Sequence, residues 1–132
     1  MTPELTYLAY SIILLFVIVF IQASANIRTM GGLVLANNRD NLPAPSTFGA
    51  RAKRNVENLR ENLWFFAPAV LIAAIVGTSN QWTILGAQIF LYSRIAHAIW
   101  YATGWPILRA FLWLAGVIGC AFIFLALFGI LA

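Results

Sequence analysis

The sequence has few charged residues and a single cysteine, and each scarcity excludes a class of protein. Only 9% of its 132 residues are charged, whereas soluble domains average about 25%, so a soluble globular domain is excluded. Cys120 has no possible partner within the chain, which excludes an internal disulfide and CxxC redox chemistry. Since 62% of the residues are hydrophobic, the lipid bilayer is the solvent that fits this composition.

The net charge of +4 indicates membrane topology rather than nucleic-acid binding. Nucleic-acid surfaces need solvated basic patches, and most basic residues here lie beside long apolar runs. Most of them belong to the first connection between apolar segments or to its flank: Arg28, Arg39, Arg51, Lys53, Arg54 and Arg60. Arg109 belongs to the third connection, and the second connection and both termini have none. The positive-inside rule therefore places both termini on the non-cytoplasmic side of a multi-pass protein.

The apolar segments predict helices at about 5–25, 49–76, 82–101 and 108–131. The first is long enough to cross a hydrocarbon core of roughly 30 Å, and it lacks the basic start and cleavage site of a signal peptide. The second begins charged, becomes apolar at Leu63 and is expected to kink at Pro68. Turn-forming residue types between 26 and 48 predict a long loop. The predicted fold is an all-α integral membrane protein, a four-transmembrane-helix bundle forming one domain over residues 1–132.

The second predicted helix carries a polar stripe. Arg51, Arg54, Asn58 and Glu61 are separated by offsets of 3, 7 and 10 residues, which share one face at about 3.6 residues per turn. One interpretation is an interfacial collar of snorkelling arginines. An amide and an acid at the edge of the apolar run favour instead a face that points toward other helices.

A second polar stripe lies on the third predicted helix, where Arg94, His97 and Tyr101 share one face. Ionisable groups at membrane depth are costly, usually face the bundle interior and mark functional sites. His97 alone would be interpreted as a buried core histidine, but its two neighbours favour a ligand site. Arg109 brings another cation to the start of the fourth helix. No metal site is expected.

These residue types suit a small zwitterionic molecule that carries carboxylates. Guanidinium groups bind carboxylates in a bidentate fashion, whereas an acid and amides receive an ammonium group and peptide groups. Glutathione, which has two carboxylates, one amine and one thiol, is such a molecule. A cationic pocket would also favour the thiolate form of a bound thiol, so no catalytic cysteine of the protein would be needed.

Three segments resemble the MAPEG family, the membrane-associated proteins in eicosanoid and glutathione metabolism. The stretch Arg51-Ala-Lys-Arg54-Asn-Val-Glu-Asn58-Leu-Arg-Glu61-Asn62 resembles the second-helix signature of the family, R-x-x-R-A-H-x-N-x-x-E-N. Arg94-Ile-Ala-His97-Ala-Ile-Trp-Tyr101 resembles its third-helix pattern, and Pro106-Ile-Leu-Arg109 its segment before the fourth helix. The overall form is similar to the compact bacterial members, which implies a bacterial inner membrane.

The resemblance implies a homotrimer that binds glutathione between subunits near the cytoplasmic face. The residues it implies as glutathione ligands are Arg51, Arg54, Asn58, Glu61, Arg94, His97 and Tyr101. Arg109 would be the catalytic residue, since it would stabilise the thiolate. The implied activity is that of a membrane-bound glutathione-dependent transferase or peroxidase acting on lipophilic electrophiles or hydroperoxides, with membrane lipid around it.

Departures from the family pattern keep an alternative open. Asn55 and Val56 replace the Ala-His of the second-helix signature. Ala110 and Trp113 stand where prostaglandin E synthases of the family carry a serine and a tyrosine, which argues against prostaglandin synthesis. Thiol activation would then depend on Arg109 alone. The alternative is a non-catalytic membrane scaffold or partner subunit that retains the fold.

Overall fold

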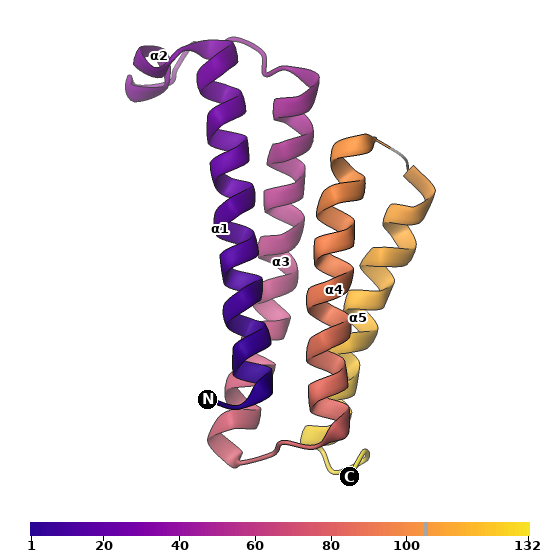
Figure 1. Ribbon diagram of the computed structural model, residues 1–132. Coiled ribbons are helices and arrows are strands. Elements are labelled where there is room, and N and C mark those ends of the chain that lie inside the picture. The colour runs from indigo at the N-terminus through magenta and orange to yellow at the C-terminus, as the bar shows by residue number, and fades with distance from the viewer. Residues whose placement is uncertain (105) are drawn as a thin grey trace.

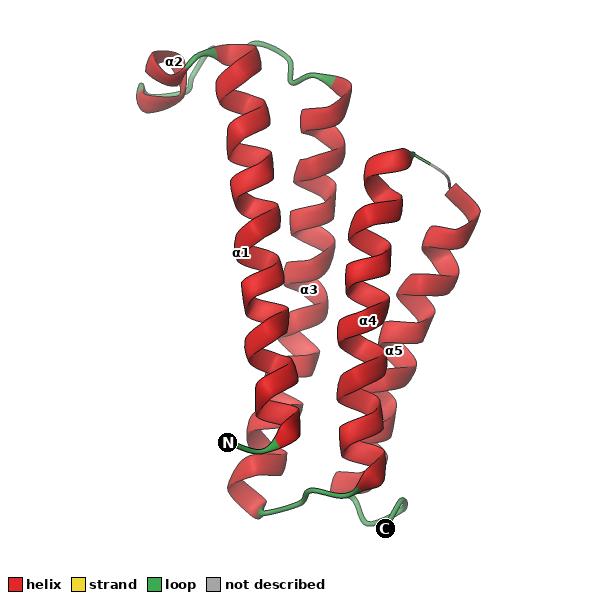
Figure 2. Ribbon diagram, in the orientation of Figure 1, coloured by secondary structure: helices red, strands yellow, loops and turns green. Residues whose placement is uncertain are grey.

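The chain is all-helical in the computed structural model, which describes residues 1–104 and 106–132 (Figure 1). The helices are α1 (Pro3–Met30), α2 (Gly32–Ala36), α3 (Thr47–Val76), α4 (Gln81–Thr103) and α5 (Pro106–Leu127). The described residues contain no strand (Figure 2). The prediction of an all-α protein is therefore confirmed.

Side chains before the first turns fix where the long helices begin. The Ser46 hydroxyl accepts a hydrogen bond from the Gly49 amide at 3.0 Å and caps α3. Asn80 and Thr83 form a capping box at the start of α4. Gly77 and Gly104 end α3 and α4 in the left-handed conformation, with φ of 72° and 86°, which glycine adopts without a steric penalty.

The predicted loop over 26–48 is wrong for part of its length. Residues 26–30 continue α1, and residues 32–36 form α2. Polar side chains do not end a helix if they bond to it, and the Thr29 hydroxyl donates to the Ala25 carbonyl at 3.0 Å. The last helix ends at Leu127 rather than at the predicted 131. Pro68 lies inside α3, which continues to Val76.

The helices pack mainly in two pairs, α1 with α3 and α4 with α5 (Figure 1). Small residues allow α4 and α5 to approach closely, because a Cβ added to Gly86 would lie 2.5 Å from the Gly119 carbonyl oxygen. Between the pairs, the rings of Phe66 and Phe90 stack with centroids 3.8 Å apart, and both side chains are fully buried. The bundle therefore has one apolar core to which α1, α3, α4 and α5 all contribute, with this ring stack between the two pairs.

The outer surface of the bundle is apolar. Helices α1, α3 and α5 are each long and apolar enough to cross a membrane. Large apolar side chains point outward, such as Phe16, Trp64 and Ile75, which are 64%, 73% and 83% exposed. Water would solvate such a surface poorly, whereas lipid would solvate it well. The chain is therefore a membrane protein.

Polar residues gather at the two ends of the bundle. Both termini and the α3–α4 turn lie at one end, which we call the N-terminal end (Figure 1). The α1–α3 connection, the end of α4 and the start of α5 lie at the opposite end (Figure 1), and by their positions in these helices Arg28, Arg51, Arg54 and Arg109 belong to this end. We call this the arginine end.

Candidate functional site

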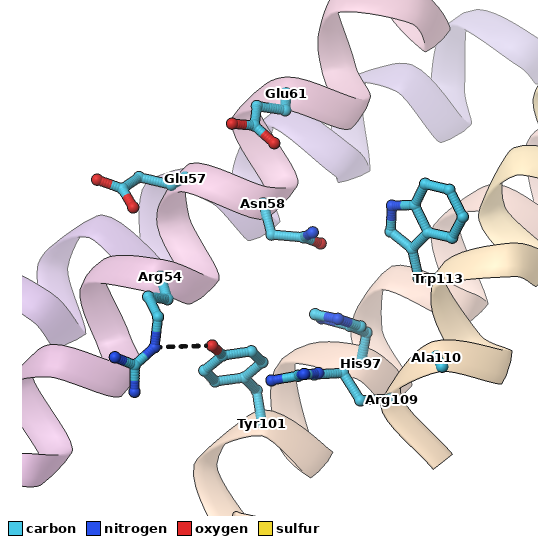
Figure 3. A pocket seen from close by; sticks show the side chains of 9 residues that line it. All are labelled: Arg54, Glu57, Asn58, Glu61, His97, Tyr101, Arg109, Ala110 and Trp113. Carbon is cyan, nitrogen blue, oxygen red and sulfur yellow. Dashed lines mark hydrogen bonds between the residues drawn. The ribbon is translucent and has the colours of Figure 1, made fainter. Parts of the chain in front are cut away.

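A cavity of about 520 Å³ opens between α3, α4 and α5 toward the arginine end (Figure 3). We call it the polar cavity; its lining residues are Arg54, Glu57, Asn58 and Glu61 from α3, His97 and Tyr101 from α4, and Arg109, Ala110 and Trp113 from α5. A smaller arginine cavity of about 180 Å³ is lined by Arg51, Arg54, Tyr101, Gly104, Pro106 and Arg109. The two cavities share Arg54, Tyr101 and Arg109.

The residues from α3 reach the polar cavity because of helical spacing. Arg54, Asn58 and Glu61 succeed one another at intervals of four and three residues, so their side chains leave α3 on the same side (Figure 3). They come from the charged first part of α3, before its apolar part begins. The cavity therefore lies where the bundle changes from polar to apolar.

Tyr101 connects two of the arginines in the polar cavity. Arg54 Nε donates a hydrogen bond to the Tyr101 hydroxyl at 3.0 Å (Figure 3). The Arg109 guanidinium carbon lies 5.3 Å from the centroid of the same ring, within cation–π range. The buried His97 ring lies 5.6 Å from the Tyr101 ring. These contacts bring cations from α3 and α5 to one aromatic side chain of α4.

Arg54 and Arg109 form no ion pair among the described residues, although the carboxylates of Glu57 and Glu61 line the same cavity. Among the described residues, the ion pair found is Lys53 with Glu57, at 3.9 Å and exposed to solvent. Neither Arg54 nor Arg109 has a carboxylate of the described residues within ion-pair distance. Unpaired guanidinium groups around a cavity favour an anionic ligand, because they bind carboxylates in a bidentate fashion.

Arg94, predicted as a ligand, points into the protein and lines neither cavity. Its side chain is only 2% exposed, and Nη2 donates to the carbonyl oxygens of Leu112 at 2.6 Å and Trp113 at 3.1 Å. Nη1 donates to Asn58 Oδ1 at 3.2 Å. Arg94 thus joins α4 to the backbone of α5 and to a side chain that lines the polar cavity.

Gly116 leaves room for the Arg94 guanidinium group, and it is not among the residues predicted from the sequence. A Cβ at this position would lie 2.7 Å from Arg94 Nη2, so a side chain there would displace the guanidinium group. The signal in the sequence is a pair of glycines, Gly116 and Gly119, within an apolar helix, where small residues mark close contacts.

The other predicted residues divide between the two cavities. Arg51 lines the arginine cavity but not the polar cavity, and its guanidinium group lies beside Gly104, where a Cβ would be 3.0 Å away. Glu57 and Trp113 line the polar cavity and were not predicted as site residues. Helical spacing could have indicated both, since Glu57 follows Arg54 by three residues and Trp113 follows Arg109 by four.

The fold and the site define a helical membrane protein with an arginine-lined cavity at one end. The sequence model of the MAPEG family matches residues 5–129 of the chain, so the protein belongs to the MAPEG family. No curated protein and no solved structure matches it. Members of this family generally use glutathione, and membership fits glutathione-related transferase or peroxidase chemistry at the level of the family.

Proposed function

We propose that the protein is a membrane-bound glutathione-dependent transferase or peroxidase that acts on lipophilic electrophiles or hydroperoxides. The observation that supports this function best is the grouping of unpaired Arg54 and Arg109 with Asn58 and Glu61 around one cavity. Glutathione carries the groups that such a lining can bind, and an apolar outer surface gives lipophilic substrates access from the bilayer.

In the proposed complex, the arginines bind the carboxylates of glutathione. Arg54 lines both cavities, and Arg51 adds a further guanidinium group in the arginine cavity. Glu61 and Asn58 offer acceptors to the ammonium and amide groups of the tripeptide. His97 and Tyr101 complete the lining from α4. Arg94 acts indirectly, because it holds Asn58 and α5 in place.

Arg109 is the residue that we assign to catalysis. Its guanidinium group would stabilise the glutathione thiolate, which then attacks the electrophilic carbon; the S–C bond forms, and the leaving group departs with its bonding electrons. With a hydroperoxide, the thiolate attacks the terminal oxygen, the O–O bond breaks, and the alkoxide takes a proton. A second glutathione then reduces the sulfenic acid, giving glutathione disulfide and water.

We also propose how the protein sits in the membrane. Helix α4 lies beside the three apolar helices and would be the fourth span, because its Arg94 and His97 side chains are buried within the bundle. The basic arginine end would face the cytoplasm of a bacterial inner membrane, with both termini on the other side. The subunits would form a homotrimer, and the polar cavity would be completed by a neighbouring subunit.

Conjugation of glutathione to a lipophilic nitroaromatic halide by the purified protein tests the proposal. We expect thiol transfer by the wild type and a loss of about 10²–10³ in rate for Arg109→Ala, the range found when a charge-stabilising group is removed. The thiolate absorbance of bound glutathione should fall with it. Arg60→Ala is the matched control, because Arg60 is exposed and lines neither the polar cavity nor the arginine cavity.

Equal rates for the wild type and Arg109→Ala would contradict the enzymatic function. They would favour instead a scaffold or partner subunit that retains the family fold. A rate that falls as much in Arg60→Ala as in Arg109→Ala would contradict the assignment of the catalytic residue, since the effect would then reflect basic charge in general.

A further inference from the structure

A third cavity, of about 490 Å³, lies between α1, α3 and α4 and uses a different face of α3 from the polar cavity. We call it the apolar cavity; its lining residues are Leu14, Val17, Ile18, Ile21, Phe48, Arg51, Ala52, Asn55, Ile95, Ala98, Ile99, Tyr101, Ala102 and Thr103. Arg51 is the one charged residue among them. The volume of the apolar cavity is in the range of small-molecule sites, about 300–1,000 Å³.

An apolar groove adjoins this cavity along α1. The groove has a volume of about 780 Å³ and contains the exposed rings of Phe16 and Phe20. It shares Val17, Ile21 and Phe48 with the apolar cavity, so the two spaces lie on either side of a common wall. The charged residue that lines the groove is Arg28, in the last turn of α1.

Each space therefore combines an apolar length with one arginine at the same end of the bundle. Arg28 lies near the end of α1 and Arg51 in the first part of α3, and these helix ends lie together at the arginine end (Figure 1). Below them, the apolar middle of α1 lines both spaces, and mostly apolar residues of α3 and α4 form the rest of the apolar cavity. This order of cation and apolar wall matches that of a lipid headgroup and its chains.

We propose that the apolar cavity and the adjoining groove bind the two acyl chains of one anionic phospholipid, with its phosphate headgroup at Arg28 and Arg51. Two adjacent apolar spaces divided by a shared wall suit a two-chain lipid better than a single-chain amphiphile. Two guanidinium groups suit an anionic headgroup better than a zwitterionic one. The proposal depends on the membrane location of the protein. It shares Arg51 with the proposed glutathione site, because Arg51 lines both the arginine cavity and the apolar cavity, whereas Arg28 belongs to the lipid site alone.

Native mass spectrometry of the full chain in a neutral detergent tests the headgroup preference. Phosphatidylglycerol and phosphatidylcholine with identical chains are offered together, and we expect the wild type to retain phosphatidylglycerol preferentially. One arginine near a membrane surface is worth enough to change this ratio about fivefold, so Arg28→Gln and Arg51→Gln should each lower it by about that factor. Arg60→Gln is the matched control and should leave it unchanged.

A second variant tests the chains. Ala102 lines the apolar cavity and is exposed, so Ala102→Phe should fill the cavity without entering the core and should reduce retention of both phospholipids. Arg51→Lys, which keeps the charge, should retain the preference and serves as the variant for which folding is least affected. Helix content is checked by circular dichroism for each variant.

Three results would overturn the proposal. The first is equal retention of the two phospholipids by the wild type, and the second is an equal loss of preference in Arg60→Gln and Arg51→Gln. The third is displacement of phosphatidylglycerol by an equal concentration of a long-chain fatty acid, which would identify a single-chain occupant. Glutathione binding is measured separately, and because Arg28 lines neither the polar nor the arginine cavity, a change confined to lipid binding in Arg28→Gln leaves the proposed enzymatic function unaffected.

Discussion

The two ends of the bundle both place polar side chains next to apolar helices, but they use them differently. At the N-terminal end, Glu4 is only 2% exposed, and its Oε1 accepts hydrogen bonds from the hydroxyls of Thr83 and Ser79 at 2.5 and 2.9 Å. Asn80 Nδ2 donates to the Leu131 carbonyl at 2.9 Å. At the arginine end, by contrast, polar side chains surround cavities.

The difference shows that a polar residue in an apolar helix has two common uses. Glu4 joins α1 to the α3–α4 turn and the start of α4, and its partners belong to the chain itself. Arg54 and Arg109 have no acidic partner among the described residues and line a space that a ligand can fill. Arg94 resembles Glu4 in this respect, because backbone carbonyls receive its hydrogen bonds.

Residues with partners inside the chain and residues that line a cavity should differ in their effect on stability. The largest effect is expected at Arg94. Replacing it with Met should lower the free energy of unfolding by about 2–3 kcal/mol, because charge-assisted hydrogen bonds to α5 and Asn58 are lost from a buried position. Arg94→Lys should not restore the stability, since one ammonium group cannot reproduce the planar fork of the guanidinium. Equilibrium unfolding in mixed micelles measures the change.

Arg54→Met is the counterpart for this comparison. It should change stability by less than about 1 kcal/mol and instead weaken the binding of glutathione, because Arg54 is exposed and lines the cavities. The comparison would fail if Arg94→Met were as stable as the wild type while Arg54→Met unfolded readily.

Gly116→Ala tests whether α5 makes room for the Arg94 guanidinium group. The added Cβ would lie 2.7 Å from Arg94 Nη2, so we expect a loss of about 1–3 kcal/mol in unfolding free energy. The loss should shrink in the Arg94→Met background, where the guanidinium group is absent, and a double-mutant cycle measures that coupling. Gly32→Ala is the control, because nothing lies within 4 Å of its added Cβ. Equal losses in both backgrounds would mean that Gly116 does not accommodate Arg94.

The helices and one face of the site could be predicted from the sequence. Whether each polar side chain faces a ligand or a partner inside the protein was predicted less well. Long apolar runs and helical spacing are local properties, so the long helices and the shared direction of Arg54, Asn58 and Glu61 could be inferred. Arg94 and His97 were expected to share one ligand-facing surface for the same reason. The structure separates them, because Gly116 of α5 leaves room for the Arg94 guanidinium, and spacing within α4 carries no information about its neighbour.

A smaller effect is expected at the N-terminal end. Glu4→Ala removes the acceptor of the Thr83 and Ser79 hydroxyls and should lower the unfolding free energy by about 1–2 kcal/mol. Glutathione transfer per folded molecule should stay at the wild-type level, since Glu4 lines neither the polar nor the arginine cavity. Activity and the folded fraction are measured on the same samples. Activity that falls further than the folded fraction would show that the N-terminal end also serves the site.

The smallest effect is expected for Tyr101→Phe, which removes only the hydroxyl that accepts a hydrogen bond from Arg54 Nε. The ring remains, so its contact with Arg109 is kept. One hydrogen bond is worth about 0.5–1.5 kcal/mol, which predicts a two- to tenfold rise in the Kd for glutathione by calorimetry. Tyr92→Phe is the matched control, because Tyr92 is an exposed residue of the same helix that lines neither the polar nor the arginine cavity. If Tyr101→Phe changed stability but not glutathione affinity, Tyr101 would belong with Arg94 and Glu4 among the residues whose partners lie within the chain, and it would not be a ligand-binding residue of the polar cavity.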